Sequence, residues 1–318
     1  MAVAGIDCGT NSIRLLIADV QNPGSGVRLV DRERRMQIVR LGQGVDATGQ
    51  FAQAALERTY AAVREYAQLI EQHGVSATRF VATSATRDAA NREEFLDTVT
   101  EILGVRPEVI SGQEEAQLSF AGATGILPQE SGSERLVIDL GGGSTEFVVG
   151  SGNTPRQALS IDMGCVRITE RFFAAGEPDS ATLHRAADFI DSQLAQLDLL
   201  NLRQLRDVVG VAGTITTLAA QALGLSSYQS DVIHGTALSF EELRRACEVI
   251  TTMSREHRAQ LGFMHPGRVD VIAAGALIVQ RITHYLERVT EREVNRLRVS
   301  EHDILDGIAL SVAAAQRN

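Results

Sequence analysis

The stretch Arg135-Leu-Val-Ile-Asp-Leu-Gly-Gly-Gly-Ser-Thr-Glu-Phe-Val-Val-Gly150 organises the rest of the chain. An apolar run ends in Asp139, three glycines and two hydroxyl residues follow, and a second apolar run begins at Phe147. This order predicts a strand, a tight turn and a second strand. Glycines let backbone N–H groups approach an anion closely, and a carboxylate at the strand end suits a hydrated Mg²⁺ above it. A plain hairpin is the alternative, because Gly-rich turns are common.

The same pattern occurs near the N-terminus, in Val3-Ala-Gly-Ile-Asp-Cys-Gly-Thr-Asn-Ser12. When Asp7 is aligned with Asp139, Gly9 matches Gly141 and Ser12 matches Ser144. An internal repeat of this kind indicates duplicated structural units. We therefore expect two similar domains that face one phosphate across a cleft.

Two such loops resemble the actin-like ATPase superfamily, and the closer match is the exopolyphosphatase/guanosine pentaphosphatase (Ppx/GppA) family. Seven motifs carry this resemblance, in the family's order and over nearly the whole chain. They are Asp7-Cys-Gly-Thr-Asn-Ser12, Thr83-Ser-Ala-Thr-Arg87, Ser111-Gly-Gln-Glu-Glu-Ala116, Asp139-Leu-Gly-Gly-Gly-Ser-Thr-Glu146, Met163-Gly-Cys-Val-Arg-Ile-Thr-Glu-Arg-Phe172, Gly213-Thr-Ile-Thr-Thr217 and His234-Gly-Thr-Ala-Leu-Ser239. The resemblance implies an α/β fold of two actin-like (ribonuclease-H-like) domains with the active site in the interdomain cleft.

Composition limits the possible functions. The 318 residues are 44% hydrophobic and carry a net charge of −10, and all 30 basic residues are arginine. The absence of lysine excludes a Walker-type phosphate loop and lysine Schiff-base chemistry. An acidic chain without a basic run argues against nonspecific nucleic-acid binding. Three scattered cysteines favour a reducing compartment over a disulfide framework or zinc site.

The length favours about two domains. We expect the first over residues 1–126 together with a C-terminal helix at about 302–318, and the second over 127–301. The polar segment Leu127–Ser133 is the expected boundary. No apolar run is long enough to span a bilayer and no signal peptide is visible, so we expect a cytoplasmic protein. Longer family members carry a further C-terminal domain, and this sequence stops before it. A homodimer is also expected.

Two further segments contain candidate catalytic residues. Arg87 follows the predicted strand at 80–82 and precedes a helix expected over 88–103. A cation at a helix N-terminus is disfavoured by the dipole, so Arg87 there indicates a nearby anion. Ser111-Gly-Gln-Glu114 has capping-box spacing, which would leave Glu115 free to face the cleft. The family resemblance also places the catalytic base at this second glutamate; without it, two ordinary first-turn glutamates would be preferred.

The resulting hypothesis is hydrolysis of a terminal phosphoanhydride bond, most simply that of inorganic polyphosphate. Glu115 would be the general base, with Glu146 and Arg87 also catalytic. Mg²⁺ (or Mn²⁺) would lie between the phosphates and Asp7, Asp139 or Glu146. The phosphate-binding candidates are Gly9, Thr10, Asn11, Ser12, Gly141, Gly142, Gly143, Ser144, Thr145, Arg167, Gly213, Thr214 and Arg268.

Other functions stay open at this point. Guanosine pentaphosphate or nucleoside triphosphates are alternative substrates within the family. A small-molecule kinase would need a second substrate pocket with its own base, and no kinase-specific motif is visible. A catalytically silent nucleotide sensor would not need Glu115 and Glu146. Without an extended basic surface, we expect a preference for short polyphosphate chains and little processivity.

Overall fold

The computed structural model describes residues 1–21, 27–125, 127, 134–174 and 176–316. The chain divides into two compact units, and each is described separately. Unit 1 comprises residues 1–122 and 302–318, and unit 2 comprises residues 123–301. Of the linker predicted at Leu127–Ser133, all but Leu127 lies outside the described residues. Within those ranges no helix is long and apolar enough to cross a membrane.

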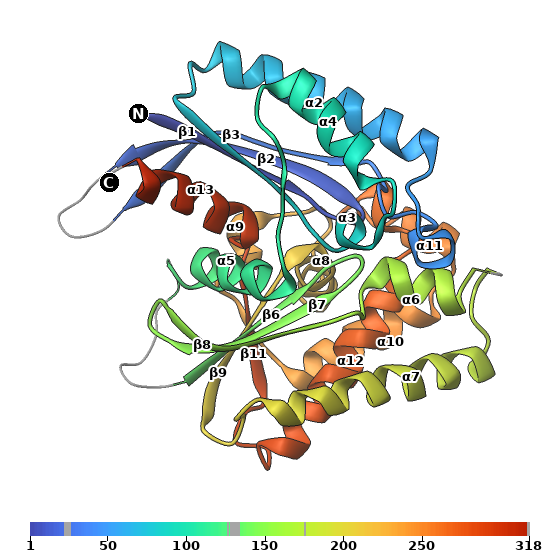
Figure 1. Cartoon of the computed structure of the whole chain (residues 1–318). Coiled ribbons are helices and arrows are strands. Elements are labelled where there is room, and N and C mark those ends of the chain that lie inside the picture. Colours follow the sequence, from blue (N-terminus) through green and yellow to red (C-terminus); the bar gives the residue numbers. More distant parts are fainter. Residues whose placement is uncertain (22–26, 126, 128–133, 175, 317–318) are drawn as a thin grey trace. The chain divides into compact units, whose positions relative to one another are not determined.

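Unit 1 contains one five-stranded sheet with the order β3-β2-β1-β4-β5. Its strands are β1 (Ala2–Cys8), β2 (Ser12–Gln21), β3 (Arg28–Ile38), β4 (Ala77–Ala82) and β5 (Glu108–Val109). Its helices are α1 (Val45–Thr48), α2 (Gln53–Gln72), α3 (Ser84–Asp88), α4 (Arg92–Leu103), α5 (Gly112–Thr124), which runs past the unit boundary, and α13 (Ile304–Ala315). Helices α2 and α4 lie on one face of the sheet and α13 on the other (Figure 1).

Alternation along the strands builds both faces of this sheet. Ile13, Leu15 and Ile17 of β2 pack in the core beneath α2 and α4, whereas Leu16 and Ala18 contact α13. Successive residues of a strand point to opposite faces, so a strand that is covered on both sides is apolar throughout. On β1 the same alternation turns Asp7 toward the face that α13 covers.

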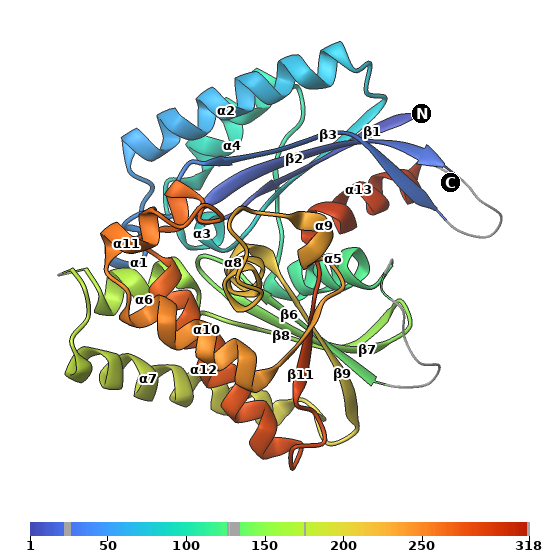
Figure 2. The same ribbon diagram turned by 180° about the vertical axis from the view of Figure 1, so that it is seen from behind.

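Unit 2 contains a six-stranded sheet with the order β10-β11-β9-β6-β7-β8. Its strands are β6 (Glu134–Leu140), β7 (Thr145–Ser151), β8 (Thr154–Ile161), β9 (Leu205–Val211), β10 (Ala237–Ser239) and β11 (Arg296–Val299). Its helices are α6 (Cys165–Phe172), α7 (Ser180–Leu194), α8 (Ala212–Ala222), α9 (Ser230–Ile233), α10 (Phe240–Thr252), α11 (Arg255–Ala259) and α12 (Ile272–Val289), with 3₁₀ turns at Ala195–Leu199 and Pro266–Arg268. Helices α7, α10 and α12 form one layer (Figure 2).

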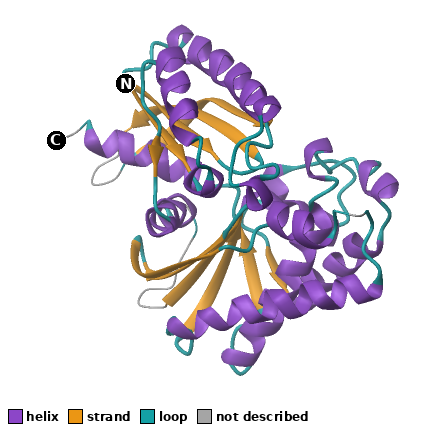
Figure 3. Cartoon of the chain, turned by 45° about the vertical axis from the view of Figure 1, so that its right-hand side comes forward, coloured by secondary structure: helices purple, strands orange, loops and turns teal. Residues whose placement is uncertain are grey.

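The two sheets have the same topology. In each, a central strand pairs antiparallel with the strand that follows it and parallel with a later one: β1 with β2 and β4, and β6 with β7 and β9. A third strand extends each hairpin, and a second parallel strand extends the other side. Strand β10 is the addition in unit 2. Figure 3 shows the two sheets in orange. The repeat predicted from the loops is therefore a repeat of the whole strand order.

Two elements of unit 1 differ from what the sequence pattern indicates. The apolar residues at 27–30 and 36–41 favour two separate strands on either side of the charged run Asp31–Arg35, but β3 is continuous. It is an edge strand, where charges are tolerated, and a bulge opposite Ile17 and Ala18 absorbs the additional residue. Arg32 and Arg34 form ion pairs with Asp19 and Asp31. The helix expected over 88–103 is instead the short α3 followed by α4.

Candidate active site

The first glycine loop connects β1 to β2. The Gly9 N–H donates to the Ser12 carbonyl at 3.0 Å, which closes the turn. The Thr10 carbonyl accepts from the Gly42 N–H at 2.9 Å, and the Asn11 carbonyl accepts from the N–H groups of residues 39 and 40. Because C=O and N–H of one trans peptide point in opposite directions, the N–H groups of Asn11 and Ser12 face away from this segment.

The second loop, between β6 and β7, is closed in the same way. The Gly141 N–H donates to the Ser144 carbonyl at 3.0 Å. The N-terminus of α6 binds the loop carbonyls, since Cys165 N–H donates to Gly141 and Val166 N–H to Gly142. Arg167 Nε donates to the Gly143 carbonyl at 2.9 Å. The N–H groups of Gly142, Gly143 and Ser144 therefore point away from α6, in an arrangement suited to an anion.

A glycine behind each loop makes this packing possible. A Cβ built on Gly164 would lie 2.2 Å from the Gly142 carbonyl oxygen, and one built on Gly42 would lie 2.3 Å from the Thr10 Cγ2 atom. Both approaches are too close for any other residue without a shift. Gly164 lies in the Met163–Phe172 motif without a predicted role and Gly42 was not predicted, although each follows the third strand of its hairpin by three or four residues.

Cross-strand pairing brings two acidic residues together in unit 2. Asp139 of β6 lies directly opposite Glu146 of β7, so both side chains are on the same face of the sheet. They are 6% and 1% exposed, and Ser160 Oγ donates to Glu146 Oε1 at 2.8 Å. Oxygen ligands of this kind suit Mg²⁺ or Mn²⁺. In the described part of the chain, no three His, Cys, Asp or Glu residues gather into a metal site, so the remaining ligands would have to be substrate or water oxygens.

The corresponding pair in unit 1 has a different charge. Asp7 lies opposite Arg14, not opposite a second carboxylate. Arg14 donates to Asp7 Oδ2 through Nε at 2.9 Å and through Nη2 at 2.6 Å. Asp7 was predicted as a metal ligand, and the structure gives its carboxylate to an arginine that sequence analysis did not consider. Arg14 could have been identified from the sequence, because it aligns with Glu146 when Asp7 is aligned with Asp139.

Arg87 and Glu115 are brought together in unit 1. Arg87 Nη1 donates to Glu115 Oε2 at 2.7 Å and to the Ile110 carbonyl at 3.0 Å. Glu115 is 8% exposed, and burial raises its pKa to about 7 although Arg87 acts in the opposite direction. A carboxylate that titrates near neutrality is suited to accept a proton from water.

The structure differs from the sequence-based expectation for Arg87 and for the capping box at Ser111. Arg87 lies in the last turn of α3, where the helix dipole favours a cation, and not at a helix N-terminus. The capping box at Ser111 is only half formed. The Glu114 N–H donates to Ser111 Oγ at 3.2 Å, but the Glu114 carboxylate pairs with Arg79 at 2.7 Å. Glu114 is nevertheless engaged elsewhere and does not share the contact between Glu115 and Arg87.

The predicted residues at the start of α8 are also assembled in unit 2. Ala212 has a positive φ of 71°, an uncommon conformation that turns the chain from β9 into the helix. A Cβ on Gly213 would lie 2.2 Å from the Arg268 guanidinium carbon, so Gly213 makes room for that side chain. Arg268 Nη1 also contacts Thr217 Oγ1 at 3.4 Å. Thr145, by contrast, donates its hydroxyl to the Met163 carbonyl and is fully buried.

Comparison with known proteins identifies the family of this chain. The model of the Ppx/GppA phosphatase family matches residues 16–311. The chain belongs to this family. It is 45% identical over 320 residues to Exopolyphosphatase 2 of Mycobacterium tuberculosis, covering 98% of each chain. The structure of an exopolyphosphatase-like protein is similar with a TM-score of 0.94 and 41% identity, over 100% of this chain and 99% of that one. The Aquifex aeolicus member of the Ppx/GppA family gives a TM-score of 0.81 and 30% identity over the same shares.

These matches confirm the predicted Ppx/GppA family and the α/β fold. The structures of the exopolyphosphatase-like protein and of the Aquifex aeolicus Ppx/GppA member align over essentially the full chain, so they share the fold described above.

Proposed function

We propose that this Ppx/GppA protein is an exopolyphosphatase that hydrolyses the terminal phosphoanhydride bond of inorganic polyphosphate and releases orthophosphate. The observation that carries the proposal is the pair of glycine loops, each closed by the same hydrogen bond and each with its carbonyls bound by the protein. Such loops present consecutive N–H groups to an anion. The similarity to Exopolyphosphatase 2 supports polyphosphate as the substrate.

The catalytic roles follow from charge and contact. Phosphoryl transfer depends mainly on positioning and charge neutralisation. Loop amides would hold the terminal phosphates, and Glu115 would take the proton of the attacking water. Arg87 would position Glu115 through its 2.7 Å hydrogen bond and use its other donors on a phosphate oxygen. Arg167 would support the second loop through the Gly143 carbonyl, and Arg268, seated on Gly213, would add positive charge in unit 2.

A divalent metal ion is part of the proposal. Members of this phosphatase family generally depend on one, and Asp139 and Glu146 form a buried, cross-strand pair of oxygen donors that fits Mg²⁺ or Mn²⁺. The ion would neutralise charge on the phosphate oxygens. Asp7 is a weaker candidate because its Oδ2 atom already accepts two hydrogen bonds from Arg14.

We also propose that short chains are preferred and that the enzyme is a cytoplasmic homodimer. A net charge of −10, with no lysine, offers little extended basic surface for a long polyanion. All three cysteines are free and buried, as in proteins of reducing compartments. Light scattering on the purified protein would give the oligomeric state.

One assay tests the function directly. Phosphate release is measured from polyphosphates of defined length, guanosine pentaphosphate and ATP, with and without a chelator. We expect the highest kcat/KM per chain end on short polyphosphate and no activity after chelation. Higher kcat/KM on guanosine pentaphosphate or ATP would reassign the substrate within the family. Consumption of long chains without intermediates, in preference to short ones, would contradict the length preference.

A further inference from the structure

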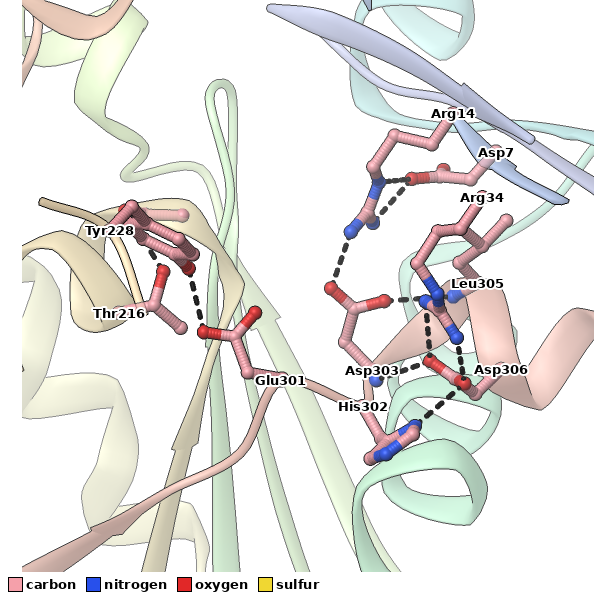
Figure 4. Close-up of polar contacts among 11 residues, drawn as sticks. Asp7, Arg14, Arg34, Thr216, Tyr228, Glu301, His302, Asp303, Leu305 and Asp306 are labelled. Atoms are coloured by element: carbon pink, nitrogen blue, oxygen red, sulfur yellow. Dashed lines mark hydrogen bonds and ion pairs between the residues drawn. The ribbon is translucent and has the colours of Figure 1, made fainter. Parts of the chain in front are cut away.

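Arg14 lies between two buried carboxylates in unit 1. Asp7 accepts its Nε and Nη2 donors, and Asp303 accepts a short hydrogen bond from Nη1 (Figure 4). Asp303 comes from the C-terminal part of the chain, 289 residues further on. Both carboxylates are only 4% exposed. One guanidinium thus serves two negative charges, and the cluster keeps one negative charge in excess.

Burial and the neighbouring charges act on the pKa values of these groups in opposite directions. Burial alone would lower the pKa of Arg14, but Asp303 and Asp7 raise it well above its ordinary value, so the arginine stays charged. Burial raises the pKa of Asp7, Arg14 acts in the opposite direction, and the Asp303 charge adds to the rise. The two carboxylates therefore repel each other across a shared partner.

The cluster lies beside the first glycine loop. Asp7 precedes the loop and Arg14 follows it, each within two residues of the turn between β1 and β2. Arg14 contributes one positive charge beside the first loop. The Asp7 and Asp303 carboxylates that pair with it contribute two negative charges, so one negative charge is left over. An excess negative charge in a partly buried position weakens the binding of an anion more than it would in water.

Helix capping alone does not explain a charge at this position. Asp303 caps α13, because its Oδ1 accepts from the Leu305 N–H at 3.0 Å. Asparagine and serine cap helices about as well as aspartate. The negative charge of Asp303 is therefore needed for the ion pair with Arg14, whereas the helix cap needs only a hydrogen-bond acceptor.

We propose that Asp303 is a specificity-determining residue, which makes the first loop discriminate against metal-free phosphate chains in favour of chains whose charge a divalent cation has reduced. This inference rests on the proposed phosphate-binding role of the loop. The ligand class is a condensed phosphate complexed with a divalent cation. The discrimination is electrostatic, since the free polyanion meets the excess negative charge with more charge of its own.

Asp303→Asn tests the inference, because asparagine keeps the helix cap and removes the charge. Asp306→Asn is the matched control. Asp306 belongs to the same capping box and loses the same charge, but it pairs with Arg34 and His302 and makes no hydrogen bond to Arg14. Binding of pyrophosphate is measured by calorimetry, without divalent metal and with excess Mg²⁺. Asp303→Ser, which also caps, replaces Asp303→Asn if the latter has a lowered melting temperature.

We expect Asp303→Asn to bind metal-free pyrophosphate roughly tenfold more tightly than wild type, which corresponds to one unit charge acting over ~12 Å at an effective dielectric constant of about 20. Binding of the Mg²⁺ complex should change less, and Asp306→Asn should match wild type in both conditions. Equal affinities in wild type and Asp303→Asn would overturn the inference, as would equal gains in the two variants. Asn11→Pro is included to test the loop itself, because proline removes one of the N–H groups that the loop presents: if it folds and binds pyrophosphate as wild type does, the proposed role of the loop fails, and this inference with it.

Discussion

The loops at Cys8–Ser12 of unit 1 and Leu140–Ser144 of unit 2 follow the same backbone path, closed in each case by a hydrogen bond of 3.0 Å between N–H and C=O three residues apart. Their cross-strand neighbours differ. Asp7 faces Arg14, whereas Asp139 faces Glu146. Duplication preserved the geometry that presents amides, and divergence changed the charge beside them. The difference suggests a division of work, in which unit 2 supplies metal ligands and unit 1 supplies the base and a phosphate loop flanked by the cluster of Asp7, Arg14 and Asp303.

The largest expected effect concerns the base, which is assigned to unit 1 alone. Glu115→Gln should lower kcat by roughly 10²–10⁴ with little change in substrate affinity. Glu114→Gln is the control, because Glu114 precedes it on α5 and pairs with Arg79 instead. Near-wild-type turnover of Glu115→Gln, measured as phosphate release, would remove Glu115 from the mechanism and the base from unit 1.

The pH dependence sharpens the same assignment. Burial raises the pKa of Glu115 to about 7, and only the deprotonated carboxylate accepts a proton. We therefore expect kcat/KM to fall about tenfold per pH unit below pH 7. The Glu114→Gln variant should keep this acid limb. An acid limb near the ordinary glutamate pKa would show that another group is titrating.

A metal titration tests the division of work directly. Glu146→Gln should raise the Mg²⁺ concentration for half-maximal activity by at least roughly 10- to 100-fold, the range for loss of a residue that only orients a metal ligand. Arg14→Gln, at the matched position of unit 1, should leave that concentration unchanged while altering KM. Equal shifts in the two variants would mean that the loops share the metal, and the comparison would fail.

The Arg87 contact offers a smaller effect. Arg87→Lys should lower kcat/KM roughly tenfold, because lysine cannot hold Glu115 and bind a phosphate oxygen with one planar group. Arg79→Lys, which alters the pair with Glu114, should retain activity. If Arg87→Lys equals wild type in steady-state kinetics, the residue supplies only diffuse charge.

Alanine substitutions at Gly164 and Gly42 test which of the two loops is packed more rigidly. Gly164→Ala should destabilise the protein by about 1–3 kcal/mol, because the new methyl group meets the Gly142 carbonyl at 2.2 Å. Gly42→Ala should cost less, since it meets the Thr10 methyl group, which can rotate away. Thermal unfolding of both variants gives the order. A larger loss for Gly42→Ala would indicate that the first loop is the more constrained.

What the sequence predicted depended on how local the signal was. The glycine loops and their strand ends were predictable because aspartate, glycine and hydroxyl residues lie within a few positions of one another. The short helix α3 was not, because five residues carry no helical period. Asp303, the second partner of Arg14 beside Asp7, could not have been predicted from a local pattern, because it is 289 residues away. The left-handed Ala212 breaks the preference of its residue type.

Helix α13 has a consequence for the synthesis of the protein. Leu305 and Ala309 pack on Leu16 and Ala18 of β2, and a Cβ on Gly307 would lie 1.9 Å from the Leu118 carbonyl oxygen, so the helix is part of the core of unit 1. On the ribosome, the N-terminal part of unit 1 is translated first but lacks this helix until residues 304–315 emerge, after unit 2. Unit 2 is continuous and can complete its fold earlier. Until then, the face of the N-terminal sheet that α13 covers, which includes Leu16 and Ala18, stays exposed to solvent. A chaperone that binds exposed apolar surface would act at this stage.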